Sequence, residues 1–260
     1  MWLAVDIGNT NTVLGLYELE NARQRHRWRI SSDRDRTTDE VILLLGQLLR
    51  SAGADPQQIG GVVIGSVVPA LTTVFREALG TVIECRLIEV SSRLNLDLKI
   101  AIRDPDQIGA DRLANAVAAR HRYRGAVIVV DFGTATTFDV ISGEGEYLGG
   151  AIAPGVRTSA RDLFSRAARL PRFVEIREPS AVIGKTTEES ILSGLFYGTV
   201  GQVDGVVRRI TEQLGGQVTV LATGGLAHLI APSSVTIQEV CPDLTLEGLI
   251  LIGQMVMMPG

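Results

Sequence analysis

The sequence predicts an α/β protein of two duplicated domains, each a mixed sheet flanked by helices, over residues 1–110 and 111–260. Three observations predict this fold. Residues 3–17 and 129–141 repeat one pattern: an apolar run, Asp-x-Gly, a cluster rich in Thr, and a second apolar run. A weaker repeat, an apolar strand ending at glycine, links residues 62–66 with residues 220–225. Strands and helices alternate along the whole chain, which is typical of the α/β class.

Local patterns predict the elements in order. Each Asp-x-Gly repeat predicts a β-hairpin with a polar, glycine-containing turn. Thr37 or Thr38 is a candidate N-cap for an amphipathic helix ending near Ala52, with acidic residues in its first turn. The other expected strands are residues 28–31, 59–67, 82–90 and 218–222. The other expected helices are residues 69–79, 111–123, 187–214, 226–230 and 246–258, with another helix within 149–170.

The composition indicates a globular cytoplasmic protein. Hydrophobic residues make up 45% of the chain and charged residues 21%, which excludes a disordered chain. The apolar runs are too short to cross a membrane. A signal peptide would need an uninterrupted apolar run near the N-terminus, and Asp6 interrupts that run. A net charge of −4 gives no electrostatic footprint for nucleic acid. Cys85 and Cys241 form no metal-ligand pattern and are expected to be buried apolar residues.

The two Asp-x-Gly turns carry the groups that phosphate binding requires. Glycine lets backbone N–H groups approach an anion, Thr and Asn side chains add donors, and Asp can hold a metal ion against phosphate. One such turn is more often an ordinary hairpin. The matched pair predicts two phosphate-binding loops that face one nucleotide. The repeat pairs Asp6 with Asp131, Gly8 with Gly133, and Thr12 with Thr137.

A third candidate element is Thr223-Gly224-Gly225, between an expected strand and a short expected helix. Backbone without side chains lets a flat ring lie against it. The alternative is a tight strand-to-helix turn with no ligand. In combination with two phosphate loops, the segment predicts an adenosine pocket.

Together these motifs resemble the phosphate-1, phosphate-2 and adenosine motifs of the acetate and sugar kinase, Hsp70 and actin superfamily. This resemblance implies two actin-like (ribonuclease H-like) domains. Within the superfamily, the sequence is similar to the type III pantothenate kinases. The closer match rests on residues 6–12, 66–69, 109–112, 131–137, 149–155, 184–186 and 223–225, in family order along nearly the whole chain. One position departs: Ile102 occupies a place where the family often has a Tyr that lines the pantothenate pocket.

Gly109-Ala110-Asp111-Arg112 has the chemistry of a phosphoryl-acceptor site. Phosphoryl transfer needs an in-line hydroxyl, charge neutralisation and a group that accepts the hydroxyl proton. Asp111 is the candidate catalytic base, and the Arg112 guanidinium suits a substrate carboxylate. The residues alone favour the alternative that Asp111 only begins the following helix. The resemblance favours the base, and implies that Gly109, Ala110, Asp111 and Arg112 bind the acceptor.

The resemblance implies ATP-dependent phosphorylation of pantothenate to 4′-phosphopantothenate, the first step of coenzyme A biosynthesis. It implies that Asp6 organises Mg²⁺ through water and that Asp131 binds K⁺ or NH₄⁺. It further implies a homodimer in which Thr186 completes the partner's pantothenate site, with Lys185 a surface or interface residue. The implied ATP contacts are Asp6, Ile7, Gly8, Asn9, Thr10, Asn11, Thr12, Val13, Thr134, Thr223, Gly224 and Gly225.

Three competing functions belong to other classes. A small-sugar or acetate-type kinase would share the loops, but it would have a longer acceptor domain. A chaperone of the Hsp70 kind would need a separate peptide-binding domain. A regulatory protein resembling the Bvg accessory factor group would keep the family's motifs, and the sequence leaves this last alternative open.

Overall fold

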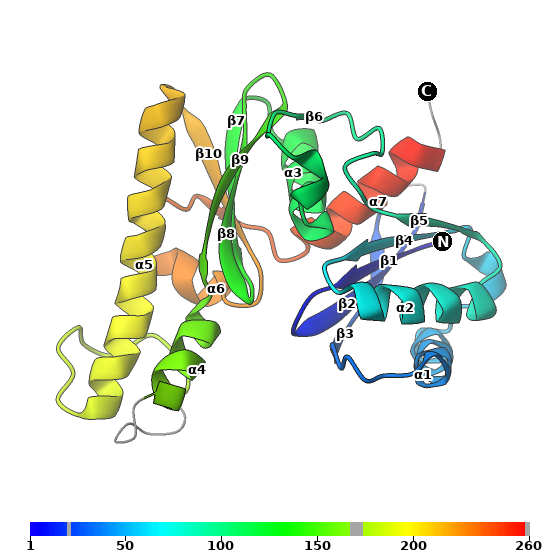
Figure 1. Cartoon of the computed structure of the whole chain (residues 1–260), viewed down its shortest axis with the longest axis horizontal. Helices are drawn as coiled ribbons and strands as arrows, with labels where there is room; N and C mark the ends of the chain where they lie inside the picture. The colour runs from blue at the N-terminus through cyan, green and yellow to red at the C-terminus, as the bar shows by residue number, and fades with distance from the viewer. Residues whose placement is uncertain (20–21, 167–173, 258–260) are drawn as a thin grey trace. The chain divides into compact units, whose positions relative to one another are not determined.

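The computed structural model describes residues 1–19, 22–166 and 174–257, which form two compact units (Figure 1). Unit 1 comprises Met1–His121 and Asp243–Gly260, and unit 2 comprises Arg122–Pro242. These units differ from the predicted domains in two places. Nearly all of helix α3 (Ala110–Arg122) and the whole of helix α7 (Leu244–Met257) belong to unit 1.

Helix α7 belongs to unit 1 because its apolar residues pack against β1 and β4 of that unit's sheet. Its glycines bring it close to its neighbours. A Cβ on Gly253 would overlap the Trp2 ring, and a Cβ on Gly248 would overlap the carbonyl oxygen of Ala114 in α3. The Thr245 hydroxyl also donates a hydrogen bond of 2.8 Å to Asn115 Oδ1 in α3.

The sheet of unit 1 has the strand order β3-β2-β1-β4-β5. β1 pairs antiparallel with β2, and β2 antiparallel with β3, whereas the β1–β4 and β4–β5 pairs are parallel. Besides α3 and α7, the elements of unit 1 are β1 (Trp2–Ile7), β2 (Asn11–Tyr17), β3 (Gln24–Ser31), α1 (Thr38–Ser51), β4 (Gly61–Ser66), α2 (Pro69–Val82), β5 (Arg86–Glu89) and β6 (Lys99–Ile100).

The strands of unit 2 follow the order β9-β8-β7-β10-β11. Its elements are β7 (Ala126–Phe132), β8 (Ala135–Ile141), β9 (Glu146–Pro154), α4 (Val156–Arg166), α5 (Thr187–Leu214), β10 (Val218–Thr223), α6 (Ala227–Ile230) and β11 (Glu239–Val240). β7–β8 and β8–β9 are antiparallel, and β7–β10 and β10–β11 are parallel. Unit 2 therefore repeats the order and directions of unit 1, which confirms the predicted α/β fold with mixed sheets.

Helix periodicity explains how each sheet is covered. In α1, Val41, Leu45 and Leu49 recur every fourth residue and are buried in the core of unit 1. Thr37 is its N-cap in a capping box with Glu40, which is worth about 1 kcal/mol. This confirms the predicted start of α1. In unit 2, the long helix α5 buries a similar stripe against the strands, including Phe196, Val200, Val203 and Val207.

One expected strand is shorter in the structure, and one expected helix fills only part of its range. The strand expected at 82–90 begins only at Arg86, because Val82 extends α2 and packs against the core of unit 1. The helix expected within 149–170 is α4, which begins at Val156 because the preceding residues form β9. The last residues of that expected helix, 167–170, and the last residue of the closing helix, Met258, lie outside the described residues. No helix of the described ranges is long and apolar enough to cross a membrane.

Candidate active site

The first candidate phosphate loop is the turn between β1 and β2 in unit 1. The Gly8 N–H donates to Asn11 O at 3.1 Å, and the exposed tip of the turn is Asn9-Thr10. Ser32, which follows β3, makes two hydrogen bonds to this turn. Its N–H donates to Thr10 O at 3.0 Å, and its hydroxyl shares a hydrogen bond of 2.9 Å with the buried Thr12 hydroxyl. The loop is therefore fixed from the neighbouring strand.

The second candidate phosphate loop, between β7 and β8 in unit 2, is one residue shorter. Residues 8–11 separate the paired Ile7 and Thr12, whereas residues 133–135 separate Phe132 and Thr136. The structural counterpart of Thr12 is therefore Thr136, and the predicted pairing of Thr12 with Thr137 is wrong. The prediction assumed the same spacing from Asp to Thr in both repeats, but the second turn has one residue fewer.

The shorter loop leaves a buried hydroxyl without a partner. Thr136 is 1% exposed, and its Oγ1 makes no hydrogen bond within the part of the chain that the structure describes. Gly155 follows β9 in unit 2 just as Ser32 follows β3 in unit 1. Glycine has no hydroxyl, so Thr136 lacks the bond that Ser32 gives to Thr12.

Because the Thr12 hydroxyl is hydrogen-bonded and, among the described residues, the Thr136 hydroxyl is not, we expect their removal to change the free energy of unfolding differently. Thr12→Val should lose about 1 kcal/mol, because it removes one net hydrogen bond while keeping the side-chain shape. Thr136→Val should be neutral or stabilising, since it removes only a desolvated, unpaired hydroxyl. Urea denaturation of the two variants and the parent protein measures both values. Equal losses in the two variants would contradict the assignment.

The Thr223-Gly224-Gly225 turn lies against the second phosphate loop within unit 2. β10 is parallel to β7 and pairs Thr223 with Asp131. Gly224 has a φ of +89°, and a Cβ added to it would overlap Asp131 Oδ1 and lie 2.7 Å from Phe132 N. The Asp131 carboxylate therefore packs directly on Gly224. Two segments predicted separately, the second loop and the adenosine turn, are therefore in contact within unit 2.

Asp111 lies in the first turn of α3, in unit 1. Its Oδ1 accepts a hydrogen bond of 2.8 Å from the Arg112 N–H, and the carboxylate lies against Gly109. Burial raises the pKa of the Asp111 carboxyl above its ordinary value, opposed by the Arg112 N–H and by the Arg112 charge. A raised carboxyl pKa with a specific partner is typical of a functional group.

The Ser66–Pro69 motif contributes to the surroundings of Asp111. Val67 Cγ1 would lie 3.2 Å from a Cβ on Gly109, the residue under the Asp111 carboxylate. Val67 also lines a cavity of about 380 Å³ in unit 1, together with Ser66, Pro69 and Thr72. Unit 1 thus brings the 66–69 and 109–112 motifs into contact, and residues of the 66–69 motif also line a cavity.

Thr186 has a structural role that the site prediction missed. It is the N-cap of α5: its hydroxyl accepts from the Glu189 N–H at 3.2 Å, and Glu189 Oε2 accepts from the Thr186 N–H at 3.2 Å. The signal was present as Thr-x-x-Glu, the capping-box pattern. Lys185 is exposed, as predicted for a surface residue.

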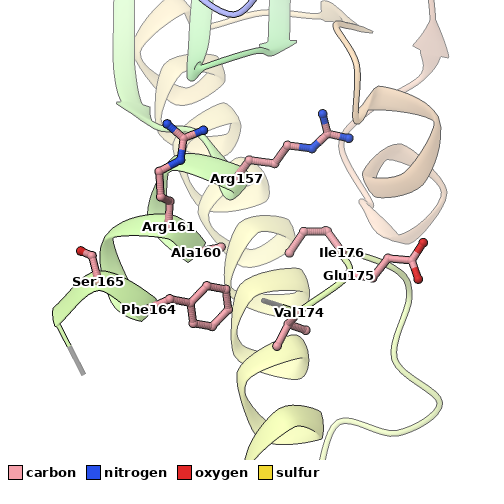
Figure 2. Close-up of a pocket in the computed structure, with 8 residues that line it drawn as sticks. All are labelled: Arg157, Ala160, Arg161, Phe164, Ser165, Val174, Glu175 and Ile176. Carbon is pink, nitrogen blue, oxygen red and sulfur yellow. The ribbon is translucent and has the colours of Figure 1, made fainter. Parts of the chain in front are cut away.

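One cavity of unit 2 is lined by none of the predicted site residues. It has a volume of about 780 Å³ and lies between α4 and residues 174–176 (Figure 2). Ala160, Phe164, Val174 and Ile176 give it an apolar lining, and Arg157, Arg161, Ser165 and Glu175 also line it. In the ranges that the structure describes, no cluster of three or more His, Cys, Asp or Glu side chains could hold a metal ion.

The duplicated strand order and the glycine-containing turn that opens each sheet define an actin-like α/β protein. The structure of the activator of the 2-hydroxyisocaproyl-CoA dehydratase from Clostridium difficile with bound ADPNP shares this fold. The TM-score is 0.56 at 12% identity, covering 96% of this chain and 92% of that chain. The chain belongs to the type III pantothenate kinase family, whose model matches residues 2–209.

Curated relatives agree with the family match over nearly the whole chain. A type III pantothenate kinase from Brevibacillus brevis is 46% identical over 97% of this chain and 98% of its own length. One from an Anaeromyxobacter species is 49% identical with the same coverage. The family resemblance predicted from the sequence is therefore confirmed.

Proposed function

We propose that the protein is an ATP-dependent kinase that phosphorylates pantothenate to 4′-phosphopantothenate, the first step of coenzyme A biosynthesis. Membership of the type III pantothenate kinase family over residues 2–209 carries the proposal. The alternative of a regulatory protein on the same scaffold is not favoured, because relatives that match 97% of the chain are named as kinases.

Asp111 is the proposed catalytic base. A carboxylate against the acceptor's primary hydroxyl orients it and takes its proton as the oxygen–phosphorus bond forms. The raised pKa of Asp111 makes it a better proton acceptor than an ordinary aspartate. Arg112, the next residue, is proposed to hold the carboxylate of pantothenate, and Gly109 and Ala110 complete the acceptor-binding segment.

ATP binding is proposed for three segments. The phosphates contact residues 6–13 and Thr134, and the adenosine lies on residues 223–225. Asp6 lies near the end of β1, which leads into the turn with the exposed Asn9-Thr10 tip. One carboxylate with several waters is how proteins commonly hold Mg²⁺. The bound Mg²⁺ would neutralise phosphate charge, while the chain's own N–H and hydroxyl groups orient the phosphates.

Asp131 is proposed to bind a monovalent cation, K⁺ or NH₄⁺. Its carboxylate lies beside the loop that is proposed to meet phosphate, and two negative charges at such short range repel each other unless a cation compensates them. Exchange of K⁺ for Na⁺ should lower the rate strongly, and Asp131→Ala should lower activity and blunt that dependence. Equal rates in the two salts would refute the cation site.

We also propose a homodimer in which Thr186 completes the partner's acceptor site. Val182 and Ile183, just before Thr186, are 63% and 84% exposed, which suits a surface that a second copy covers. The test mixes two inactive variants, Asp111→Asn and Thr186→Asp, because Asp at position 186 keeps the N-cap while repelling an anionic acceptor. Activity should reappear after subunit exchange, and its absence would contradict shared sites.

The direct test of the function is turnover by the purified protein. With ATP, Mg²⁺ and K⁺, pantothenate should be converted to a monophosphate at its primary hydroxyl, as detected by mass spectrometry. ATP turnover should depend on added pantothenate. A folded protein that leaves pantothenate unchanged under these conditions would refute the proposal.

A further inference from the structure

We infer that residues 155–158 form a brace that fixes the second phosphate loop, and that Thr158 is a positioning residue for ATP. This inference rests on the proposed function, because it takes Thr134 as a phosphate contact. It also gives a role to the end of the 149–155 glycine-rich motif, which the proposed chemistry leaves unassigned.

The brace acts on a single atom of the loop. Thr134 O accepts two hydrogen bonds, one of 3.1 Å from the Gly155 N–H and one of 2.7 Å from the Thr158 hydroxyl. Because a trans peptide points its N–H opposite its carbonyl, fixing Thr134 O also fixes the direction of the Ala135 N–H. The orientation of the whole peptide at the tip is therefore set by two donors from one segment.

Gly155 makes this approach possible. A Cβ on Gly155 would lie 2.5 Å from both Gly133 O and Thr134 O, closer than side-chain atoms approach backbone oxygens. Any residue other than glycine would push the brace away from the loop. The glycine is required here by close backbone contact with the loop.

Helix α4 holds Thr158 in place. Val156 and Ala160, one helical turn apart, are 3% and 5% exposed, and Val156 packs in the core of unit 2. The Ser159 N–H donates to Gly155 O at 2.9 Å, so the first turn of α4 begins at the brace itself. Thr158 thus donates its hydrogen bond from a helix that is anchored in the core.

The first loop contains a counterpart of the backbone bond in the brace. In unit 1 the Ser32 N–H donates to Thr10 O, just as the Gly155 N–H donates to Thr134 O in unit 2. The Ser32 hydroxyl forms its hydrogen bond with the hydroxyl of a strand residue, Thr12. In the second loop the Thr158 hydroxyl adds a side-chain hydrogen bond to the Thr134 carbonyl.

The test is Thr158→Val, which removes the hydroxyl and keeps the side-chain shape. Loss of one net hydrogen bond should raise KM for ATP about 5- to 10-fold and leave KM for pantothenate unchanged. Thr158→Ser should restore the parental KM for ATP. The matched control is Thr199→Val, because the Thr199 hydroxyl donates to Leu195 O at 2.6 Å within α5. This control should keep both KM values.

A parental KM for ATP in Thr158→Val would overturn the inference, as would an equal rise in both KM values. Failure of Thr158→Ser to rescue would also count against it. A parent protein without turnover would contradict the proposed function instead. Binding of a fluorescent ATP analogue would then make the same comparison between variants, and equal affinities of Thr158→Val and the parent would overturn the brace on its own.

Discussion

Replacing Asp111 with Asn is expected to lower kcat about 10²- to 10⁴-fold, the range of general acid–base catalysis, without lowering the melting temperature. Asn keeps an oxygen that accepts from the Arg112 N–H, but it cannot take the proton of the acceptor hydroxyl. Steady-state kinetics and thermal unfolding of the same samples measure the two effects.

The stability part of this prediction follows from the sign of the pKa shift. Burial raises the pKa of folded Asp111, so the folded state binds the proton more tightly than the unfolded state. Stability is then highest below the unfolded pKa and falls as pH rises through the raised folded pKa. At neutral pH the ionised Asp111 is destabilising, and Asp111→Asn should unfold at the same or a higher temperature. That advantage should disappear in acid.

The matched control is Asp39→Asn, which changes an acidic residue in the first turn of α1. If Asp111 only favoured the start of α3, both variants would lose the about 0.3–1 kcal/mol of a helix-dipole interaction and keep their turnover. Near-parental kcat in Asp111→Asn would therefore refute the catalytic role. The profile of kcat/KM against pH should also fall on acidification through a pKa above that of an ordinary aspartate.

Gly224→Ala is the second substitution for which we expect a large effect, on both kcat/KM for ATP and thermal stability. A side chain at a φ of +89° is strained, which costs about 1–3 kcal/mol, and its Cβ would displace the Asp131 carboxylate. Since small misplacements of binding groups reduce rates steeply, kcat/KM for ATP should fall about 10²-fold. Kinetics with ATP as the varied substrate and thermal unfolding measure the loss.

Gly225→Ala is the control for the neighbouring position. A Cβ on Gly225 meets no atom of the protein within 4 Å, so this variant should unfold at the parental temperature. If Gly224→Ala unfolded at the same temperature as Gly225→Ala, the close packing of Asp131 on Gly224 would be refuted.

Local patterns in the sequence are sufficient for most of the fold. Alternating apolar runs around Asp-x-Gly predict both hairpins, and Thr37 with its acidic first turn predicts the start of α1. The helix expected at 187–214 has the bounds of α5. These elements are predictable because the information lies within one helix or one hairpin.

The differences arise where residues distant in sequence decide the outcome. α7 is apolar on most faces, so its sequence alone does not indicate which of the two sheets it packs against. The close contact of Gly253 with Trp2 in β1 places α7 on the sheet of unit 1. That Thr136, and not Thr137, is the counterpart of Thr12 follows from the strand register, which changes when a turn loses one residue. For the site, the motifs predict roles for Asp111 and Asp131, but the contact of Asp131 with Gly224 depends on a third strand, β10.

Unit 1 is discontinuous in sequence, and this has a consequence for synthesis. Domains generally fold as units while the chain emerges from the ribosome, N-terminal segments first. All residues of unit 2 precede Asp243, so unit 2 has its complete set of strands before α7 is made. Unit 1 begins the chain and is finished last. Until then, Trp2 and Val63 lack the helix that covers them, and this apolar surface is available to a chaperone or to aggregation.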